Sequence, residues 1–158
     1  MNDPVIYTER LTLFPLSDGA MREMIDRETD PDLRQAYREM LDGCLSHPDE
    51  RAFSAVWTMR LTGSGEAVGD LCFKGLGPDG CVEIGYGTYP GYEGRGYMTE
   101  AVIALTRWAL AQPGVSRAEA ETDPGNAASQ RVLARAGYVP TGKCGEEGPR
   151  FVCDGPRG

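Results

Sequence analysis

The chain has 158 residues, of which 24 are Asp or Glu and 16 are Lys or Arg, so its formal net charge is -8. This length fits one domain over residues 1–158, and a composition that is 41% hydrophobic can fill a core without disulfides. An acidic chain without a cluster of Lys or Arg is repelled by phosphate backbones, which excludes nucleic acid as an expected partner.

The five cysteines include no Cys-x-x-Cys pair, and the chain has one histidine. An odd number of scattered thiols is typical of reduced, buried residues in a cytoplasmic protein, and the pattern predicts no metal site. The N-terminus lacks a basic segment followed by an apolar one, and no apolar run approaches the roughly 18 residues that span a bilayer. We therefore expect a cytoplasmic protein, monomer or homodimer, with no membrane partner.

The first half of the chain changes from extended to helical and back. Residues 6–16 are extended, with Leu11 and Leu13 on one face, and Ser17 or Asp18 can cap a short helix after them. The next predicted elements are a helix over residues 32–45, two strands over 53–61 and 67–73 that form a hairpin, and a strand over 81–89.

The second half alternates helix and strand. The predicted elements are a helix from after Pro90 to near residue 112, a strand over 116–122, a helix over 127–136 that Gly137 ends, and strands over 139–145 and 150–153. Antiparallel hairpins combined with one strand-helix-strand crossover indicate an α+β or α/β domain of three layers.

Two glycine-rich loops have different contexts. Gly75-Leu76-Gly77-Pro78-Asp79-Gly80 has the Gly-x-Gly-x-x-Gly spacing of a dinucleotide-binding turn, but a strand follows it directly. Because that fingerprint must open a helix, whose N-terminus holds the diphosphate, we interpret this segment as a hairpin turn.

The second loop, Gly91-Tyr92-Glu93-Gly94-Arg95-Gly96, leads into an amphipathic helix. Glycines allow a backbone to wrap around an anion, and the first helical turn has free N–H groups to offer it. The spacing alone leaves two readings open: a phosphate-binding loop, or a flexible loop in which Glu93 and Glu100 satisfy the helix end.

Three segments together resemble the GNAT superfamily of acyl-CoA-dependent N-acyltransferases. They are Val82-Glu83-Ile84-Gly85-Tyr86-Gly87, residues 91–101, and Asn126-x-x-Ser129-x-x-x-Leu133-x-x-x-Gly137-Tyr138. The opening Thr8-Glu9-Arg10-Leu11-Thr12-Leu13 is similar to the branch that contains the ribosomal-protein N-terminal acetyltransferases. The resemblance implies a GNAT-type three-layer sandwich, with a mixed, mostly antiparallel sheet of about six or seven strands and about four helices.

The resemblance also implies acetyl-CoA as co-substrate. In this family the Gln/Arg-x-x-Gly-x-Gly/Ala loop binds the diphosphate through backbone amides, and the matching residues here are Glu93, Gly94, Arg95, Gly96, Tyr97 and Met98. Gly91 stands where the family has Gln or Arg, and a carboxylate at Glu93 repels a diphosphate unless it turns into solvent. Arg131 and Arg135 are candidates for the adenosine 3′-phosphate or for a solvated basic face.

Amide formation from a thioester needs a proton acceptor, because an amine with a pKa of about 10 is protonated at neutral pH. Glu83 alternates to the same side of its strand as Gly85 and Gly87, and related enzymes often have a base on this strand. Glu83 is therefore the predicted catalytic base, acting directly or through water, with a structural hydrogen-bond acceptor as the alternative.

The departing thiolate also needs a proton. Many family members have a Tyr seven positions after the Asn, where this chain has Leu133. Ser129 matches the residue that serves this purpose in the similar branch, and Asn126 matches the residue that hydrogen-bonds the pantetheine arm. Asn126 is also a suitable helix N-cap, and the two roles are compatible.

These residues predict an acetyl-CoA-dependent N-acetyltransferase that acts on a primary amine, either a protein N-terminus or a small molecule, by direct attack in a ternary complex. The acceptor is expected in the cleft where the strand of Glu83 and the strand over 116–122 diverge. Two alternatives are a non-catalytic acyl-CoA-binding sensor of the same fold and an adenine-nucleotide domain of another kind, although no Gly-x-x-x-x-Gly-Lys-Ser/Thr is present.

Overall fold

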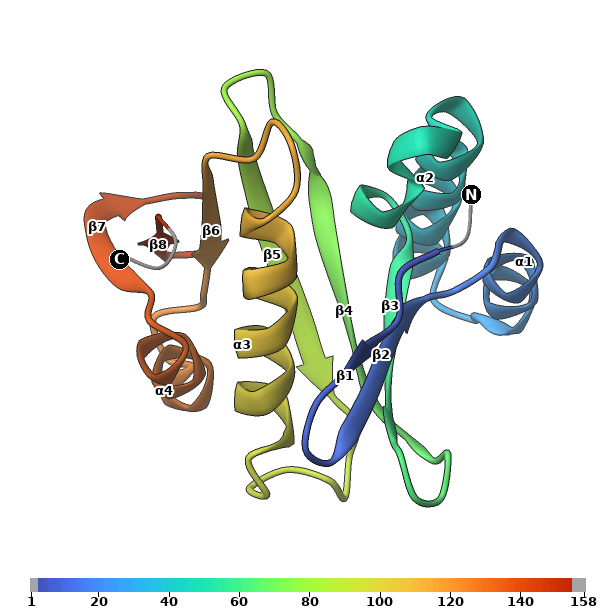
Figure 1. The fold of residues 1–158 in the computed structure, drawn as a ribbon, viewed down its shortest axis with the longest axis horizontal. Helices are drawn as coiled ribbons and strands as arrows, with labels where there is room; N and C mark the ends of the chain where they lie inside the picture. The colour runs from blue at the N-terminus through green and yellow to red at the C-terminus, as the bar shows by residue number, and fades with distance from the viewer. Residues whose placement is uncertain (1–2, 155–158) are drawn as a thin grey trace.

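The computed structural model describes residues 3–154 and has the architecture drawn in Figure 1. The strands are β1 (Ile6–Tyr7), β2 (Leu11–Pro15), β3 (Val56–Leu61), β4 (Ala67–Leu76), β5 (Cys81–Thr88), β6 (Arg117–Glu121), β7 (Val139–Cys144) and β8 (Pro149–Cys153). The helices are α1 (Asp18–Arg27), α2 (Pro31–Ser46), α3 (Tyr97–Leu110) and α4 (Ala127–Arg135), together with the 3-10 helix η1 (Pro48–Phe53). None of the helices in the described range is long and apolar enough to cross a membrane.

All the strands belong to one sheet, in the order β1-β2-β3-β4-β5-β6-β8-β7. Every neighbouring pair is antiparallel except β5 and β6, which are parallel. Parallel neighbours require a long crossover, and α3 lies in the connection between these two strands. The mixed, mostly antiparallel sheet confirms the predicted fold class.

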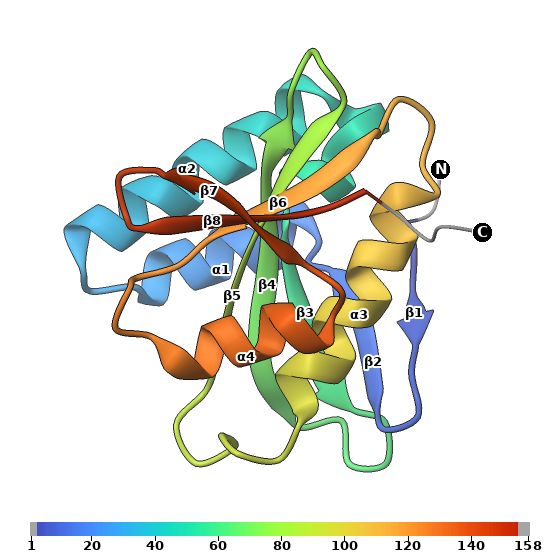
Figure 2. The ribbon, with the colours of Figure 1, turned by 90° about the vertical axis from the view of Figure 1, so that its left-hand side faces the viewer.

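Helices cover both faces of the sheet, as Figures 1 and 2 show, with α3 and α4 on one face and α1 and α2 on the other. The face towards α3 holds the larger core, in which Val82 and Ile84 of β5 pack with Val102 and Leu105 of α3. Within this core four aromatic rings contact one another, those of Phe53, Trp57, Phe73 and Trp108. The smaller core on the other face joins Met21 and Ile25 of α1, Leu41 and Cys44 of α2, and Ala55 and Val56.

Helix ends follow the capping residues in the sequence. The Ser17 hydroxyl accepts a hydrogen bond from the Ala20 amide at 3.1 Å, so Ser17, rather than Asp18, is the cap of α1. Gly137 follows α4 with a φ of 92°, the left-handed conformation that ends a helix.

Three expectations from the sequence need correction. Residues 6–16 are not one strand, because the Thr8 hydroxyl accepts a hydrogen bond from the Leu11 amide and turns the chain, so β1 and β2 form a hairpin and the sheet has eight strands. Phe53 does not begin a strand: it ends η1, and β3 begins at Val56. The cysteines are all free, but of the five only Cys44 is buried as predicted: Cys72, Cys81 and Cys153 are partly exposed and Cys144 is exposed.

Candidate functional site

A cavity of about 530 Å³ lies between the N-terminal ends of α3 and α4 and the last residues of β5. The cavity is lined by all eight residues for which the family resemblance implies cofactor binding: Glu93, Gly94, Arg95, Gly96, Tyr97, Met98, Asn126 and Ser129. Arg131 and Arg135, the two candidates for a 3′-phosphate, line the same cavity. Segments more than 25 residues apart in the chain therefore meet at one site.

The loop before α3 offers unpaired backbone donors to this cavity. Gly94 and Gly96 have φ values of 75° and 78°, the left-handed region that glycine adopts without strain. Gly96 is the N-cap of α3 and provides no side chain to cap the helix. Within residues 3–154, the amides of residues 96–99 donate to no protein group, while the next amide, that of Glu100, is bonded to the Gly96 carbonyl. A ring of free N–H groups at a helix N-terminus is suited to an anion.

Glu100 does not satisfy these amides, contrary to the reading in which Glu93 and Glu100 satisfy the helix end. Its carboxylate instead accepts hydrogen bonds from Thr8 and from the backbone amide and Nε of Arg10, the last two at 2.9 and 2.8 Å. Burial raises the pKa of Glu100, but these hydrogen bonds outweigh it and hold the pKa below its usual range.

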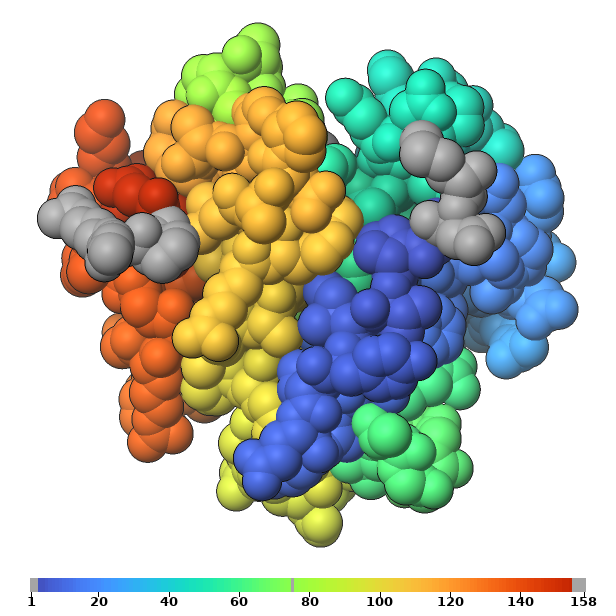
Figure 3. All heavy atoms as spheres, in the orientation of Figure 1, coloured from blue at the N-terminus to red at the C-terminus, as the bar shows by residue number. Residues whose placement is uncertain are grey.

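Arg10, in the β1–β2 hairpin, contacts the loop that precedes α3. Its Nη1 donates to the Arg95 carbonyl at 3.0 Å, and its guanidinium lies 4.6 Å from the centre of the Tyr97 ring. Figure 3 shows the β1–β2 hairpin packed beside the start of α3. Sequence reasoning noted the Thr8-Glu9-Arg10 motif but missed this support role, because the contacts span at least 85 residues.

The charged side chains of the loop are exposed. Glu93 and Arg95 both face solvent, so the Glu93 carboxylate is screened rather than buried beside the free amides. Tyr92 ties the loop to the β3–β4 hairpin, since its hydroxyl donates to Glu66.

The start of α4 brings two polar groups to the cavity. The Asn126 Oδ1 accepts from the Ser129 amide at 3.0 Å, so Asn126 is the N-cap, and its Nδ2 donates to no group within the described range. The Ser129 Oγ lies 2.7 Å from the Tyr86 hydroxyl, whose single O–H can donate either to this oxygen or to the Ser129 carbonyl, at 3.3 Å. Burial raises the pKa of Tyr86, so its phenol stays protonated at neutral pH.

Tyr86 is a site residue that sequence reasoning missed. Leu133, at the position of the family's usual Tyr, is fully buried in the core. A phenol nevertheless reaches this region from β5. The available signal was the alternation of Val82, Ile84 and Tyr86, which places all three on the face of β5 that packs towards α3 and α4.

Glu83 lies apart from the cavity, on the other face of β5. The pairing of β5 with β6 ends at Glu83 and Glu119, so beyond Glu83 the two strands diverge as predicted. Both carboxylate oxygens of Glu83 are already in ion pairs, Oε1 with Arg150 Nη2 at 3.0 Å and Oε2 with Lys74 Nζ at 2.9 Å. The structure therefore does not bring Glu83 and Ser129 into one cavity.

Known proteins are similar to this chain in sequence and in fold. The model of a family described as an acetyltransferase (GNAT) domain matches residues 8–139. An uncharacterized N-acetyltransferase, YjdG of Bacillus subtilis (strain 168), is 35% identical over 112 residues, which are 70% of this chain and 64% of that protein. This chain thus spans somewhat less than two thirds of that relative.

Solved structures of acetyltransferases have the same fold as this chain. An acetyltransferase from Agrobacterium tumefaciens str. C58 has a TM-score of 0.73 with 25% identity, covering 97% of this chain and 95% of its own. The ribosomal L7/L12 α-N-protein acetyltransferase RimL, in complex with coenzyme A, shares the fold with a TM-score of 0.73 at 15% identity, covering 96% of this chain and 98% of its own. With a family model matched over most of its length, this chain belongs to the GNAT acetyltransferase family.

Proposed function

We propose that this chain transfers the acetyl group of acetyl-CoA to a primary amine by direct attack while both substrates are bound. The observation that carries this proposal is the set of free amides at residues 96–99, which face a cavity also lined by two arginines. A diphosphate there would gain several charge-assisted hydrogen bonds and the favourable end of the α3 dipole. Asn126 Nδ2 is free to donate to the pantetheine arm.

In the proposed reaction the amine nitrogen forms a bond to the acetyl carbon as the bond from that carbon to sulfur breaks. The amine loses a proton and the sulfur gains one. Ser129 is proposed to donate to the sulfur, because Tyr86 can donate to the Ser129 Oγ and leave the serine hydrogen free to point into the cavity.

Glu83 is proposed to accept the amine proton through water. It lies where β5 and β6 diverge, and its carboxylate is held there by ion pairs with Lys74 and Arg150. A water route is favoured over direct contact because Glu83 does not line the cavity that holds Ser129.

The transfer is tested by thiol release from acetyl-CoA across a panel of primary amines. We expect amine-dependent release with intersecting initial-rate lines, since both substrates bind before reaction. Acetyl-CoA at about 100 times its Kd should also stabilise the fold by about 2.7 kcal/mol in a thermal-shift assay. A thermal shift without release by any amine would instead identify the chain as an acyl-CoA-binding sensor.

Replacing Glu83 with glutamine should lower kcat about tenfold or more at neutral pH, because glutamine accepts no proton. The deficit should shrink as the pH rises towards the amine pKa of about 10, where the amine is deprotonated without help. Asp79→Asn is the control, since Asp79 also pairs with an arginine, Arg117 at 2.7 Å, but lies in the turn before β5, ahead of the paired part of β5 and β6. Equal losses in the two variants, independent of pH, would assign Glu83 a structural role only.

A further inference from the structure

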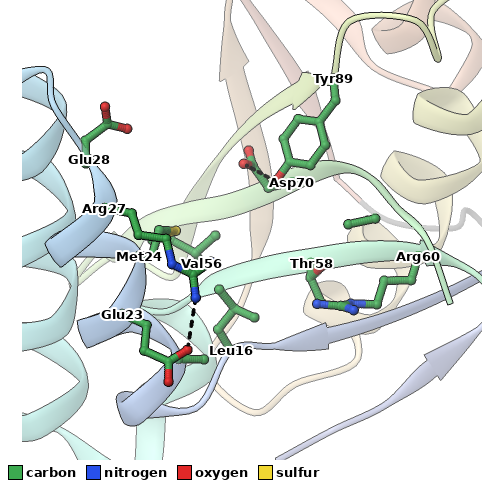
Figure 4. Close-up of a pocket in the computed structure, with 12 residues that line it drawn as sticks. Leu16, Glu23, Met24, Arg27, Glu28, Val56, Thr58, Arg60, Asp70 and Tyr89 are labelled. Carbon is green, nitrogen blue, oxygen red and sulfur yellow. Dashed lines mark hydrogen bonds and ion pairs between the residues drawn. The ribbon is translucent and has the colours of Figure 1, made fainter.

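A second cavity, of about 430 Å³, lies on the opposite face of the sheet between α1 and strands β3 and β4 (Figure 4). Consecutive residues at the end of β5 line the two cavities: Gly87 and Thr88 line the first, and the next residue, Tyr89, lines the second. Asp70, which lines the second, is the register partner of Gly87 across β4 and β5. A ligand here would therefore lie across one strand from the proposed donor site.

Asp70 brings to this cavity a carboxylate that has no cationic partner among residues 3–154. Its one hydrogen-bond partner among residues 3–154 is the Tyr89 hydroxyl, which donates to Oδ2 at 3.1 Å. Burial raises the pKa of Asp70, and the bond from Tyr89 opposes that shift in part. Burial and the Asp70 charge raise the pKa of Tyr89 to about 12, so the phenol remains a donor at neutral pH.

Arg60 brings a cation that has no anionic partner among residues 3–154. Its Nε is buried without a hydrogen-bond partner, Nη1 donates to the Gly65 carbonyl at 3.4 Å, and the guanidinium lies 5.8 Å from the centre of the Phe14 ring. In the described part of the chain no carboxylate pairs with this guanidinium, which extends back along β3 towards Thr58 (Figure 4). A partly buried cation without an anion is costly, so a bound anion here would be stabilising.

Thr58 adds a hydroxyl to the lining of the cavity. Only 5% of this residue is exposed, it lines the cavity, and its hydroxyl has no hydrogen-bond partner within residues 3–154. It is the register partner of Asp70 and lies two residues from Arg60 on the same strand. The Thr58 hydroxyl is therefore available to a polar group that enters the cavity.

The other charged side chains that line the cavity have partners within the protein. Glu23 pairs with Arg27 at 3.4 Å, and Glu28 accepts hydrogen bonds from the amides of Thr29 and Asp30. The groups left over are thus one carboxylate, one guanidinium and one hydroxyl, while Leu16, Met24 and Val56 supply an apolar wall.

We propose that the acetyl acceptor is a small primary amine that also carries an anionic group, a carboxylate or a phosphate. Its ammonium pairs with Asp70, its anionic group pairs with Arg60, and Thr58 hydrogen-bonds the atoms between them. This inference rests on the proposed acetyl transfer and narrows its acceptor. A cavity of this volume is in the range of small-molecule sites, at roughly 300–1,000 Å³.

The test compares matched amines. Glycine, β-alanine and γ-aminobutyrate are each assayed against their carboxamides, and O-phosphoethanolamine against ethanolamine, by thiol release and by calorimetric binding in the presence of coenzyme A. For at least one spacing we expect the anionic member to have a kcat/KM at least about tenfold higher. Arg60→Met should abolish this preference, whereas Arg22→Met, which removes an exposed arginine of α1, should keep it. Asp70→Asn should raise the acceptor KM about tenfold without changing the acetyl-CoA KM, and Asp26→Asn should change neither.

Two results would overturn the inference: equal use of anionic amines and their neutral partners by the unmodified protein, or a preference that survives Arg60→Met. The same experiments distinguish failure of this inference from failure of the proposed acetyl transfer. Release with neutral amines and no anionic preference would leave the transfer standing and contradict the inference. A calorimetric preference that depends on Arg60, without thiol release from any amine, would support the inference about binding and contradict the transfer.

Discussion

Replacing Ser129 with alanine is expected to lower kcat about a hundredfold, because the departing thiolate loses its proton donor. The acetyl-CoA KM should change by less than about threefold, since the loop amides that hold the diphosphate are untouched. Steady-state kinetics with one amine at saturation measures both quantities.

The Ser129→Ala substitution should not lower the stability of the fold. The cap of α4 uses the Ser129 backbone amide, which alanine retains, and alanine is the better helix former. Tyr86 keeps the Ser129 carbonyl as an acceptor. Ser46→Ala, at the exposed end of α2, is the control and should retain full kcat. A Ser129→Ala protein with unchanged kcat would show that another group protonates the sulfur.

Gly96→Val should weaken acetyl-CoA binding at least about tenfold. A β-branched residue at a φ of 78° costs more than the 1–2 kcal/mol of an ordinary side chain, so the backbone must rotate and turn the free amides away from the cavity. A Cβ at this position would also lie 3.4 Å from Arg10 Nη2, which helps to fix the loop. Calorimetric titration with coenzyme A gives the ratio of dissociation constants.

Gly142→Val is the matched control for this experiment. Gly142 has a φ of 82° on exposed β7, and a Cβ there would meet no atom within 4 Å, so the backbone strain is similar but remote from the loop. We expect both variants to lose stability and only Gly96→Val to lose affinity. Equal affinity in the two would mean that the loop conformation does not govern binding.

Much of the fold follows from local pattern. Period-two and period-3.6 runs predicted β5, α3 and β6 within a few residues, and the Gly91–Gly96 loop before an amphipathic helix located the larger cavity. These features are local, because an N-cap, a left-handed glycine or an alternating strand is determined within one or two turns of chain. The hairpin at Thr8 was missed because the deciding hydrogen bond comes from a side chain inside an extended run.

The tertiary partners could not be predicted in this way. Tyr86 meets Ser129 across 43 residues, and Arg10 meets Glu100 across 90. Such pairs depend on strand order and helix placement, which no local spacing encodes. Asp70 and Arg60 look like ordinary strand charges in the sequence, and only the register of β3 to β5 places them in one cavity.

The central claim is that the backbone amides at the start of α3 bind the diphosphate of coenzyme A. A crystal structure of the protein with coenzyme A tests it most directly. The account predicts diphosphate oxygens within about 3 Å of amide nitrogens of residues 94–99, with the thiol directed towards Ser129. A diphosphate bound elsewhere, with those amides facing only solvent, would contradict it.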